Sequence, residues 1–415
     1  MIQARRAVLK HTVASGHARG ERRAGLPGSR APGPRAPAAG AAQPGGAVRR
    51  PGGANFSSEV LRSPFDQFAV QASHNTYLWG QQSWPFWGPL GYRLQNSSSV
   101  DAVGLALDLG YRYVEIDVWP LRSREGLLGW GRTGTELHVL HAVRNYRWTE
   151  PTIKLSDVVA GIRGWLLKDE RENPASKSNP KLPLVVQLDH HVDEKDQQSV
   201  MVDELRKLED GVEGSRIISP QDFSKGTTMA SVAALSGKRK IIFLSKFESK
   251  AHEKLEGLVA LRRRGKAGDK GGNPNIYLSQ FHTSGEYYTV SDKQRDRAVA
   301  AREQGDLVEM GGDRMALTSF NFDARRAFAA RVNFIAVNPQ GRCVGHEDAC
   351  RRAERGRGGC TGECRCNRRG AMELERAFMR YGHDGYIHYP SLTPADEDQI
   401  LGSLRLSIGD LREAC

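Results

Sequence analysis

The sequence lacks any run of eighteen apolar residues, so no membrane-spanning helix is expected in its 415 residues. Its N-terminal part also lacks the apolar stretch of a secretory signal. Acidic residues are scarce there: residues 1–53 hold ten Lys or Arg against one acid, a net charge of +9. Because the whole chain carries +12, only +3 remains for residues 54–415. A nucleic-acid-binding face on a folded domain is therefore not expected.

The first 58 residues are rich in Arg, Ala, Gly and Pro, a composition that cannot bury enough apolar surface to fold. We therefore expect a disordered basic tail over residues 1–58. An organellar transit peptide, a polybasic arm attracted to anionic lipid, and an extension without an address all remain open. The expected location is the cytoplasm with peripheral attachment to membranes, and organellar targeting by the tail is the alternative.

From residue 65 to residue 390, apolar strands alternate with amphipathic helices. About eight such units predict an α/β fold, a TIM-type (β/α)8 barrel that need not be regular. Residues 391–415 are assigned to a C-terminal extension. Strands are expected at 68–70, 111–118, 138–140, 184–188, 240–244, 275–278, 315–320, 334–337 and 386–388, and helices at 100–109, 155–167, 197–208, 292–304, 323–331 and 372–380.

Two motifs place polar residues at the ends of expected strands. The first is Ser-His-Asn-Thr-Tyr at 73–77, and the second is Val-Glu-Ile-Asp-Val-Trp at 114–119. Because side chains alternate along a strand, Glu115 and Asp117 point the same way. A buried face tolerates two such carboxylates only with a cation or a proton between them. Asn75 adds a neutral oxygen, and a hard cation such as calcium takes only oxygen ligands.

These motifs resemble the catalytic domain of the eukaryotic phosphoinositide-specific phospholipases C. The corresponding strand ends of that family read Ser-His-Asn-Thr-Tyr and Val-Glu-Leu-Asp-Cys-Trp. The resemblance implies a catalytic barrel over 65–390, divided into a first box at 65–246, a linker at 249–275 and a second box at 276–390. The second box is the less similar of the two, and a Cys-rich insert at 341–370 interrupts it.

Five of the six cysteines lie in that insert, between Cys343 and Cys366. A small zinc site, local disulfides and a reduced surface loop all stay open, because the spacing matches no strong finger pattern.

By resemblance, the reaction is cleavage of phosphatidylinositol or a phosphoinositide to diacylglycerol and an inositol phosphate, cyclic or open, with Ca²⁺ as cofactor. The inositol 2-hydroxyl attacks phosphorus, and one histidine stabilises the phosphorane oxygens while another protonates the leaving oxygen. His74 takes the first role and His141 the second. Either Glu115 or Asp117 is also a candidate base. The expected metal ligands are Asn75, Glu115, Asp117 and Asp189.

Other positions bear on the substrate. Lys246 matches a family lysine that contacts ring phosphates, but Leu244 stands where the family has a second one. The Arg-x-Tyr substrate clamp of the family falls near residues 309–311, where neither residue is present. Arg314 is a weak substitute. Phosphatidylinositol and a lipid with one ring phosphate are therefore equally expected. His138 competes with His141, although a polar role on a half-exposed strand is favoured for His138.

Three of the seven tryptophans lie between residues 79 and 87. This aromatic segment, 79–90, leaves the first strand at the active-site end of a barrel, so it is expected to contact the membrane that holds the lipid substrate. Packing of its rings onto the barrel is the alternative. Two other functions remain: a glycerophosphodiester phosphodiesterase, which also uses a barrel with an early His and a Glu-x-Asp strand, and a catalytically inactive phosphoinositide-binding barrel.

Overall fold

The structure is a computed structural model that describes residues 55–79, 97–121, 136–143, 146–147, 152–209, 216–245, 252–263, 277–282, 290–311, 322, 324–339 and 362–404. The chain divides into two units, Met1–Val48 and Arg49–Cys415. The first unit lies outside the described residues, as does the predicted tail up to residue 54, so the description concerns the second unit.

Eight parallel strands form a closed ring, which confirms the predicted TIM-type barrel. The ring order is β1-β4-β9-β10-β11-β12-β13-β14, and it closes through pairing of β1 with both β14 and β4. The strands are β1 (Phe68–Ser73), β4 (Tyr113–Leu121), β9 (Leu184–His190), β10 (Ile241–Ser245), β11 (Leu261–Arg263), β12 (Tyr277–His282), β13 (Leu307–Gly311) and β14 (Phe334–Val337).

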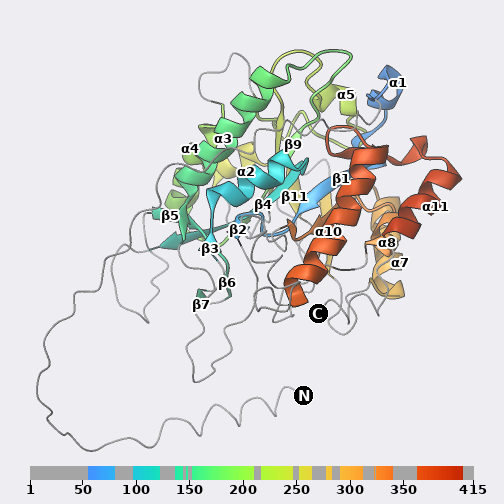
Figure 1. Ribbon diagram of the computed structural model, residues 1–415. Helices are drawn as coiled ribbons and strands as arrows, with labels where there is room; N and C mark the ends of the chain where they lie inside the picture. Colours follow the sequence, from blue (N-terminus) through green and yellow to red (C-terminus); the bar gives the residue numbers. More distant parts are fainter. Residues whose placement is uncertain are drawn as a thin grey trace, which may run out of the picture. The chain divides into compact units, whose positions relative to one another are not determined.

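Helices surround the strands (Figure 1). The described helices are α1 (Ser58–Leu61), α2 (Val100–Asp108), α3 (Leu155–Glu172), α4 (Lys195–Arg206), α5 (Met229–Val232), α6 (Glu253–Leu258), α7 (Asp292–Glu303), α8 (Arg325–Ala329), α10 (Gly362–Tyr381) and α11 (Pro394–Ser403), with short 3-10 turns at η2 (Phe65–Gln67) and η4 (Tyr389–Ser391). None of the described helices is long and apolar enough to cross a membrane.

Further short strands lie outside the ring. They are β2 (Leu78–Trp79), β3 (Ser97–Ser98), β5 (Glu136–Val139), β6 (Ala142–Val143), β7 (Tyr146–Arg147), β8 (Ile153–Lys154) and β15 (Tyr386–His388). Two of them, β5 and β15, were expected inside the barrel, and that expectation is wrong. Strand β5 pairs antiparallel with the end of β4, and β15 pairs antiparallel with the start of β1. Each pairs with one barrel strand and takes no part in the closed ring.

The strands that take their places, β11 and β13, were missed. Residues 249–275 were assigned to a linker because of their Lys, Arg and Gly content, yet 252–263 form α6 and β11. Leu258 and Leu261 there are fully buried. The expected strand at 315–320 lies outside the described residues. The C-terminal extension also belongs to the fold: α11 has a Thr393–Asp396 capping box, and its Ile400 is buried against α10 and α8 neighbours.

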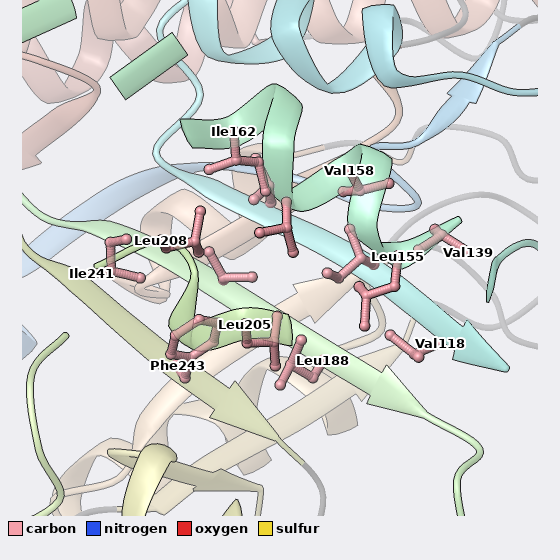
Figure 2. Close-up of a cluster of buried hydrophobic side chains, with 14 of the residues drawn as sticks. Val118, Val139, Leu155, Val158, Ile162, Leu188, Leu205, Leu208, Ile241 and Phe243 are labelled. Carbon is pink, nitrogen blue, oxygen red and sulfur yellow. The ribbon is translucent and has the colours of Figure 1, made fainter. Parts of the chain in front are cut away.

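The helix–strand layer holds most of the apolar core. Figure 2 shows Leu155, Val158 and Ile162 of α3 directed at Val118 and other side chains of the strands. Burial of each such side chain contributes about 1.5–3 kcal/mol to the free energy of folding. The helices start where polar caps allow: the Ser99 side chain accepts the Asp101 N–H at the first turn of α2. Where α2 meets α3, a Cβ on Gly161 would lie 2.3 Å from Val100 Cγ1, so only glycine permits this packing.

A buried charge network closes the end of the barrel where the strands begin. Arg112, just before β4, donates to Asp384 Oδ1 at 2.8 and 3.0 Å, and Arg239, just before β10, donates to Asp384 Oδ2 at 2.7 Å. The Leu182 N–H donates to the same carboxylate at 2.8 Å. Both guanidinium groups also lie over the Trp165 ring. Asp384 therefore joins the C-terminal segment to the first half of the barrel.

We expect Asp384→Ala to lower the free energy of unfolding by about 3–5 kcal/mol, because it leaves two buried arginines without their shared anion. Asp292→Ala is the matched control: Asp292 also accepts from an arginine, Arg326, but is 69% exposed, so its loss should cost about 1 kcal/mol or less. Urea denaturation of both variants measures the difference.

The stability difference between wild type and Asp384→Ala should also depend on pH. Burial opposes ionisation of Asp384, but the charges of Arg112 and Arg239 outweigh it and hold the pKa well below the ordinary 3.8. A lowered folded-state pKa stabilises the fold above the unfolded-state pKa, and that contribution disappears as the pH falls below about 4. A stability difference between wild type and Asp384→Ala that stays constant from pH 7 to pH 2 would contradict this assignment.

Candidate active site

Three carboxylates meet where β4 and β9 end. The two strands are parallel neighbours, and their register sets Asp117 beside Asp189 and Glu115 beside Gln187. One oxygen of each of Glu115, Asp117 and Asp189 lies within 4.8 Å of the other two. Glu115 is 4% and Asp117 6% exposed. Like charges opposite each other on neighbouring strands repel, so this arrangement needs a positive charge among the carboxylates.

The loop after β1 brings Asn75 to the same carboxylates. Asn75 has a φ of 49°, in the left-handed region that Asn tolerates better than most residues. This turn lets its N–H donate to Glu115 Oε2 at 3.1 Å. The Tyr77 hydroxyl lies 2.9 Å from Asp117 Oδ2 and 3.3 Å from Asn75 Oδ1, so it joins these two oxygens.

His74 is oriented by two neighbours. Its Nδ1 lies 2.9 Å from Asn338 Oδ1, at the end of β14, and its Nε2 lies 3.7 Å from Glu115 Oε2. When the Asn338 oxygen accepts the Nδ1 proton, Nε2 is directed at the carboxylate cluster. The side chain remains 21% exposed, so it lies at the boundary between the cluster and solvent.

His141 reaches the site from outside the ring. It was expected after a third barrel strand, but it follows β5, whose next residue, Leu140, donates its N–H to the Asp117 carbonyl at 3.2 Å. Burial, followed by the nearby charges of His74 and His191, lowers the pKa of His141 to about 3, although Asp189 opposes the shift. The imidazole is therefore neutral near pH 7.

Three other sequence candidates differ in outcome. Lys246, the expected contact to ring phosphates, and Arg314 lie outside the described residues. His138, on β5, is held by two neighbours: its ring nitrogens lie 3.0 Å from Glu136 Oε2 and 3.1 Å from Thr152 Oγ1. These partners give His138 the polar structural role that the sequence favoured.

Sequence reasoning missed three residues that hold the site in place. Gln187 Nε2 donates to Glu115 Oε1 at 2.8 Å, Tyr77 links Asp117 with Asn75, and Asn338 orients His74. A signal existed for each: Tyr77 closes the first motif, Asn338 follows β14, and Gln187 alternates with Asp189 on one strand face. Without a register, however, the sequence cannot show which polar side chain meets which.

The donor set suits a hard divalent cation. Every candidate ligand is oxygen: three carboxylates from two strand ends and the Asn75 amide close by. Such a cation would balance the charge that the register concentrates there, and both magnesium and calcium prefer this chemistry. The fold and site thus define a parallel barrel with a cation-ready acidic cluster and two histidines at the end where barrel enzymes place their chemistry.

Comparison with known proteins shows what the barrel resembles. Residues 61–247 match the family described as phosphatidylinositol-specific phospholipase C, X domain. The L. pealei PLC21 crystal structure aligns with a TM-score of 0.51 at 15% identity, covering 80% of this chain and 38% of that one. The S. officinalis PLC21 structure aligns with a TM-score of 0.47 at 16% identity, covering 68% of this chain and 34% of that one. The structure of a calcium-dependent phosphoinositol-specific phospholipase C from Pseudomonas sp. aligns with a TM-score of 0.40 at 14% identity, covering 69% of this chain and 93% of that one.

A search of curated protein sequences found no match. The chain spans little more than a third of the two PLC21 chains, and at these identities the structural likeness concerns the fold alone. Over residues 61–247 this chain thus resembles the X domain of the phosphatidylinositol-specific phospholipases C, and the closed barrel continues beyond that match to β14.

Tyr77→Phe tests the link between the hydroxyl and the acidic cluster. Removing a hydrogen bond to a ligating carboxylate typically costs 10–100-fold in metal affinity, and we expect a loss of that order here for a divalent cation. Tyr386→Phe is the control, since Tyr386 is equally buried but its hydroxyl donates to the Pro183 carbonyl, among the residues that precede β9. Titration calorimetry measures both; equal affinities in wild type and Tyr77→Phe would rule out this role.

Proposed function

We propose that this protein is a calcium-dependent phospholipase C that cleaves phosphatidylinositol or a related inositol lipid to diacylglycerol and an inositol phosphate. The observation that carries the proposal is the assembly of Glu115, Asp117 and Asp189 with His74 at one end of a barrel of this family. Calcium accepts six to eight oxygen ligands in flexible geometry, which suits carboxylates that come from two strands and an amide from a loop.

The inositol 2-hydroxyl is the nucleophile in this proposal. A calcium ion held by Asn75, Glu115, Asp117 and Asp189 would lower the pKa of that hydroxyl and offset charge on the phosphate. Glu115 is the better candidate base of the two on β4, because Gln187 and the Asn75 N–H fix both of its oxygens in place. Attack on phosphorus then yields a cyclic phosphate, and a water molecule opens it in a second step.

The two histidines divide the remaining tasks. His74, held through its Nδ1 proton by the Asn338 oxygen, donates from Nε2 to a phosphate oxygen in its imidazolium form, in which both ring nitrogens carry a proton. His141 gives a proton to the leaving diacylglycerol oxygen. The pKa of His141 is lowered to about 3 in the free protein, so the imidazole takes up this proton only when the anionic phosphodiester binds next to it and raises that pKa.

Membrane attachment completes the proposal. The aromatic segment 79–90 and the basic tail would bring the barrel to the lipid surface, at the cytoplasmic face of a membrane. Both lie largely outside the described residues, so their support is the sequence alone. Replacement of Trp84, Phe86 and Trp87 by Ala should abolish vesicle binding while hydrolysis of a soluble short-chain substrate is retained.

Product analysis with labelled phosphatidylinositol tests the function directly. We expect diacylglycerol and inositol phosphate from the wild type, loss of both in excess chelator, and a decrease of several orders of magnitude in Asp117→Asn, since metal activation contributes several kcal/mol. Glycerol phosphate and a free alcohol would instead indicate a glycerophosphodiester phosphodiesterase. Binding without any product would indicate an inactive barrel, and full activity in chelator would exclude the calcium role.

His141→Ala tests the leaving-group acid. On phosphatidylinositol we expect about 10²–10⁴-fold slower cleavage with unchanged lipid binding. A nitrophenyl phosphodiester of inositol has a leaving group that needs little protonation, so the variant should regain most of its activity on it. His138→Ala is the matched control and should be near wild type on both substrates. An equal defect of His141→Ala on both would assign His141 another role.

A further inference from the structure

The barrel interior contains a second Glu–Gln pair that the proposed mechanism does not use. On β4 and β9, Gln187 donates its amide to Glu115 at 2.8 Å. On β12 and β13, Gln280 donates its amide to Glu309 Oε1 at 2.9 Å, again from a register partner on the neighbouring strand. The first pair holds the proposed metal ligand. The second has no such function.

Glu309 points into the barrel. Val308 and Met310 pack with the outer helices, whereas Leu307 packs with the interior side chains, so the alternation along β13 turns Glu309 inward. Its carboxylate is close enough to Glu115 for the charge of Glu115 to act on it. Glu309 therefore belongs to the interior next to the catalytic cluster.

This pair has unused acceptors. Glu309 is 0% exposed, and neither its Oε2 nor the Gln280 Oε1 has a hydrogen bond of ordinary geometry within the described part of the chain, although the buried Tyr113 hydroxyl on β4 lies close enough to interact with Glu309. Burial, followed by the charge of Glu115, raises the pKa of Glu309 to about 7, while Arg263 on β11 opposes the shift. Buried acceptors without donors are costly, so these two oxygens are suited to a ligand that brings hydroxyl groups.

An inositol ring brings such hydroxyls, and a phosphorylated ring does not suit this position. A phosphate monoester carries about −1.5 to −2 charge near pH 7 and offers only acceptors. Placed beside Glu309 and Gln280 in the water-poor interior, it would set its own acceptors against two further acceptor oxygens. Among the described residues, Arg263 and His74 are the basic groups that act on Glu309.

We propose that Glu309 and Gln280 form a specificity site that accepts hydroxyls of the unphosphorylated inositol ring and rejects ring phosphates. The inference rests on the proposed function and names its substrate: phosphatidylinositol itself, in preference to its phosphorylated derivatives. The absence of the family's Arg-x-Tyr clamp at residues 309–311 agrees with this choice, because an acid stands where an arginine would hold a phosphate.

The test compares soluble short-chain phosphatidylinositol with its 4-phosphate and 4,5-bisphosphate, so that vesicle charge plays no part. Wild type should have a kcat/KM at least about tenfold higher on phosphatidylinositol. Glu309→Gln replaces one acceptor oxygen by an amide donor, so it should lower the preference for phosphatidylinositol at least about fivefold. Glu375→Gln is the matched control: Glu375 is 3% exposed and accepts from Tyr111 in the outer layer.

Each outcome decides something. A wild type that cleaves the phosphorylated lipids equally well or better overturns the specificity site, whatever the variants do, and indicates that a cation such as Arg263 captures ring phosphates instead. An unchanged preference in a folded Glu309→Gln, with its melting temperature checked, overturns the role of Glu309. Cleavage of none of the three lipids by wild type overturns the proposed function, and this inference with it.

Discussion

The register between β4 and β9 is the constraint on which the site depends. It sets Asp117 directly beside Asp189, and it sets Glu115 beside an uncharged Gln187. A shift by one residue would turn all of these side chains to the helix-covered face. The apolar residues that alternate with them, such as Val118 and Leu188, pack under α3 and α4 and hold the register in place. Hydrophobic burial thus stabilises an arrangement of carboxylates that electrostatics alone would oppose.

The two ends of the barrel treat charge in opposite ways. At the end where the strands begin, Asp384 is matched by Arg112 and Arg239, and the network is closed by hydrogen bonds. At the other end, one oxygen from each of Glu115, Asp117 and Asp189 lies within 4.8 Å of the other two. The first end neutralises its buried charges in pairs, whereas the second gathers carboxylates of the same sign.

The sequence predicted the fold and the residues of the site from local patterns. The alternation around Glu115 and the polar end of β1 are visible in any single segment, and the structure brings those segments together. What the sequence could not provide was the pairing of distant strands. Strand β5 was mistaken for a barrel strand because an apolar run does not show its direction, and β11 was missed because Arg262 and Arg263 resemble a linker.

The interior of the barrel places two similar polar pairs on different strands. Inward positions on successive strands carry apolar residues near the strand starts, such as Val70 and Leu307, and polar residues towards the strand ends. Glu115 and Glu309 occupy that polar region on different strands, each held by a glutamine neighbour. One carboxylate lies with those of Asp117 and Asp189, while the other lies apart from them on the far side of the ring order. The proposed roles in catalysis on β4 and in substrate choice on β13 therefore differ only through what lies next to each pair.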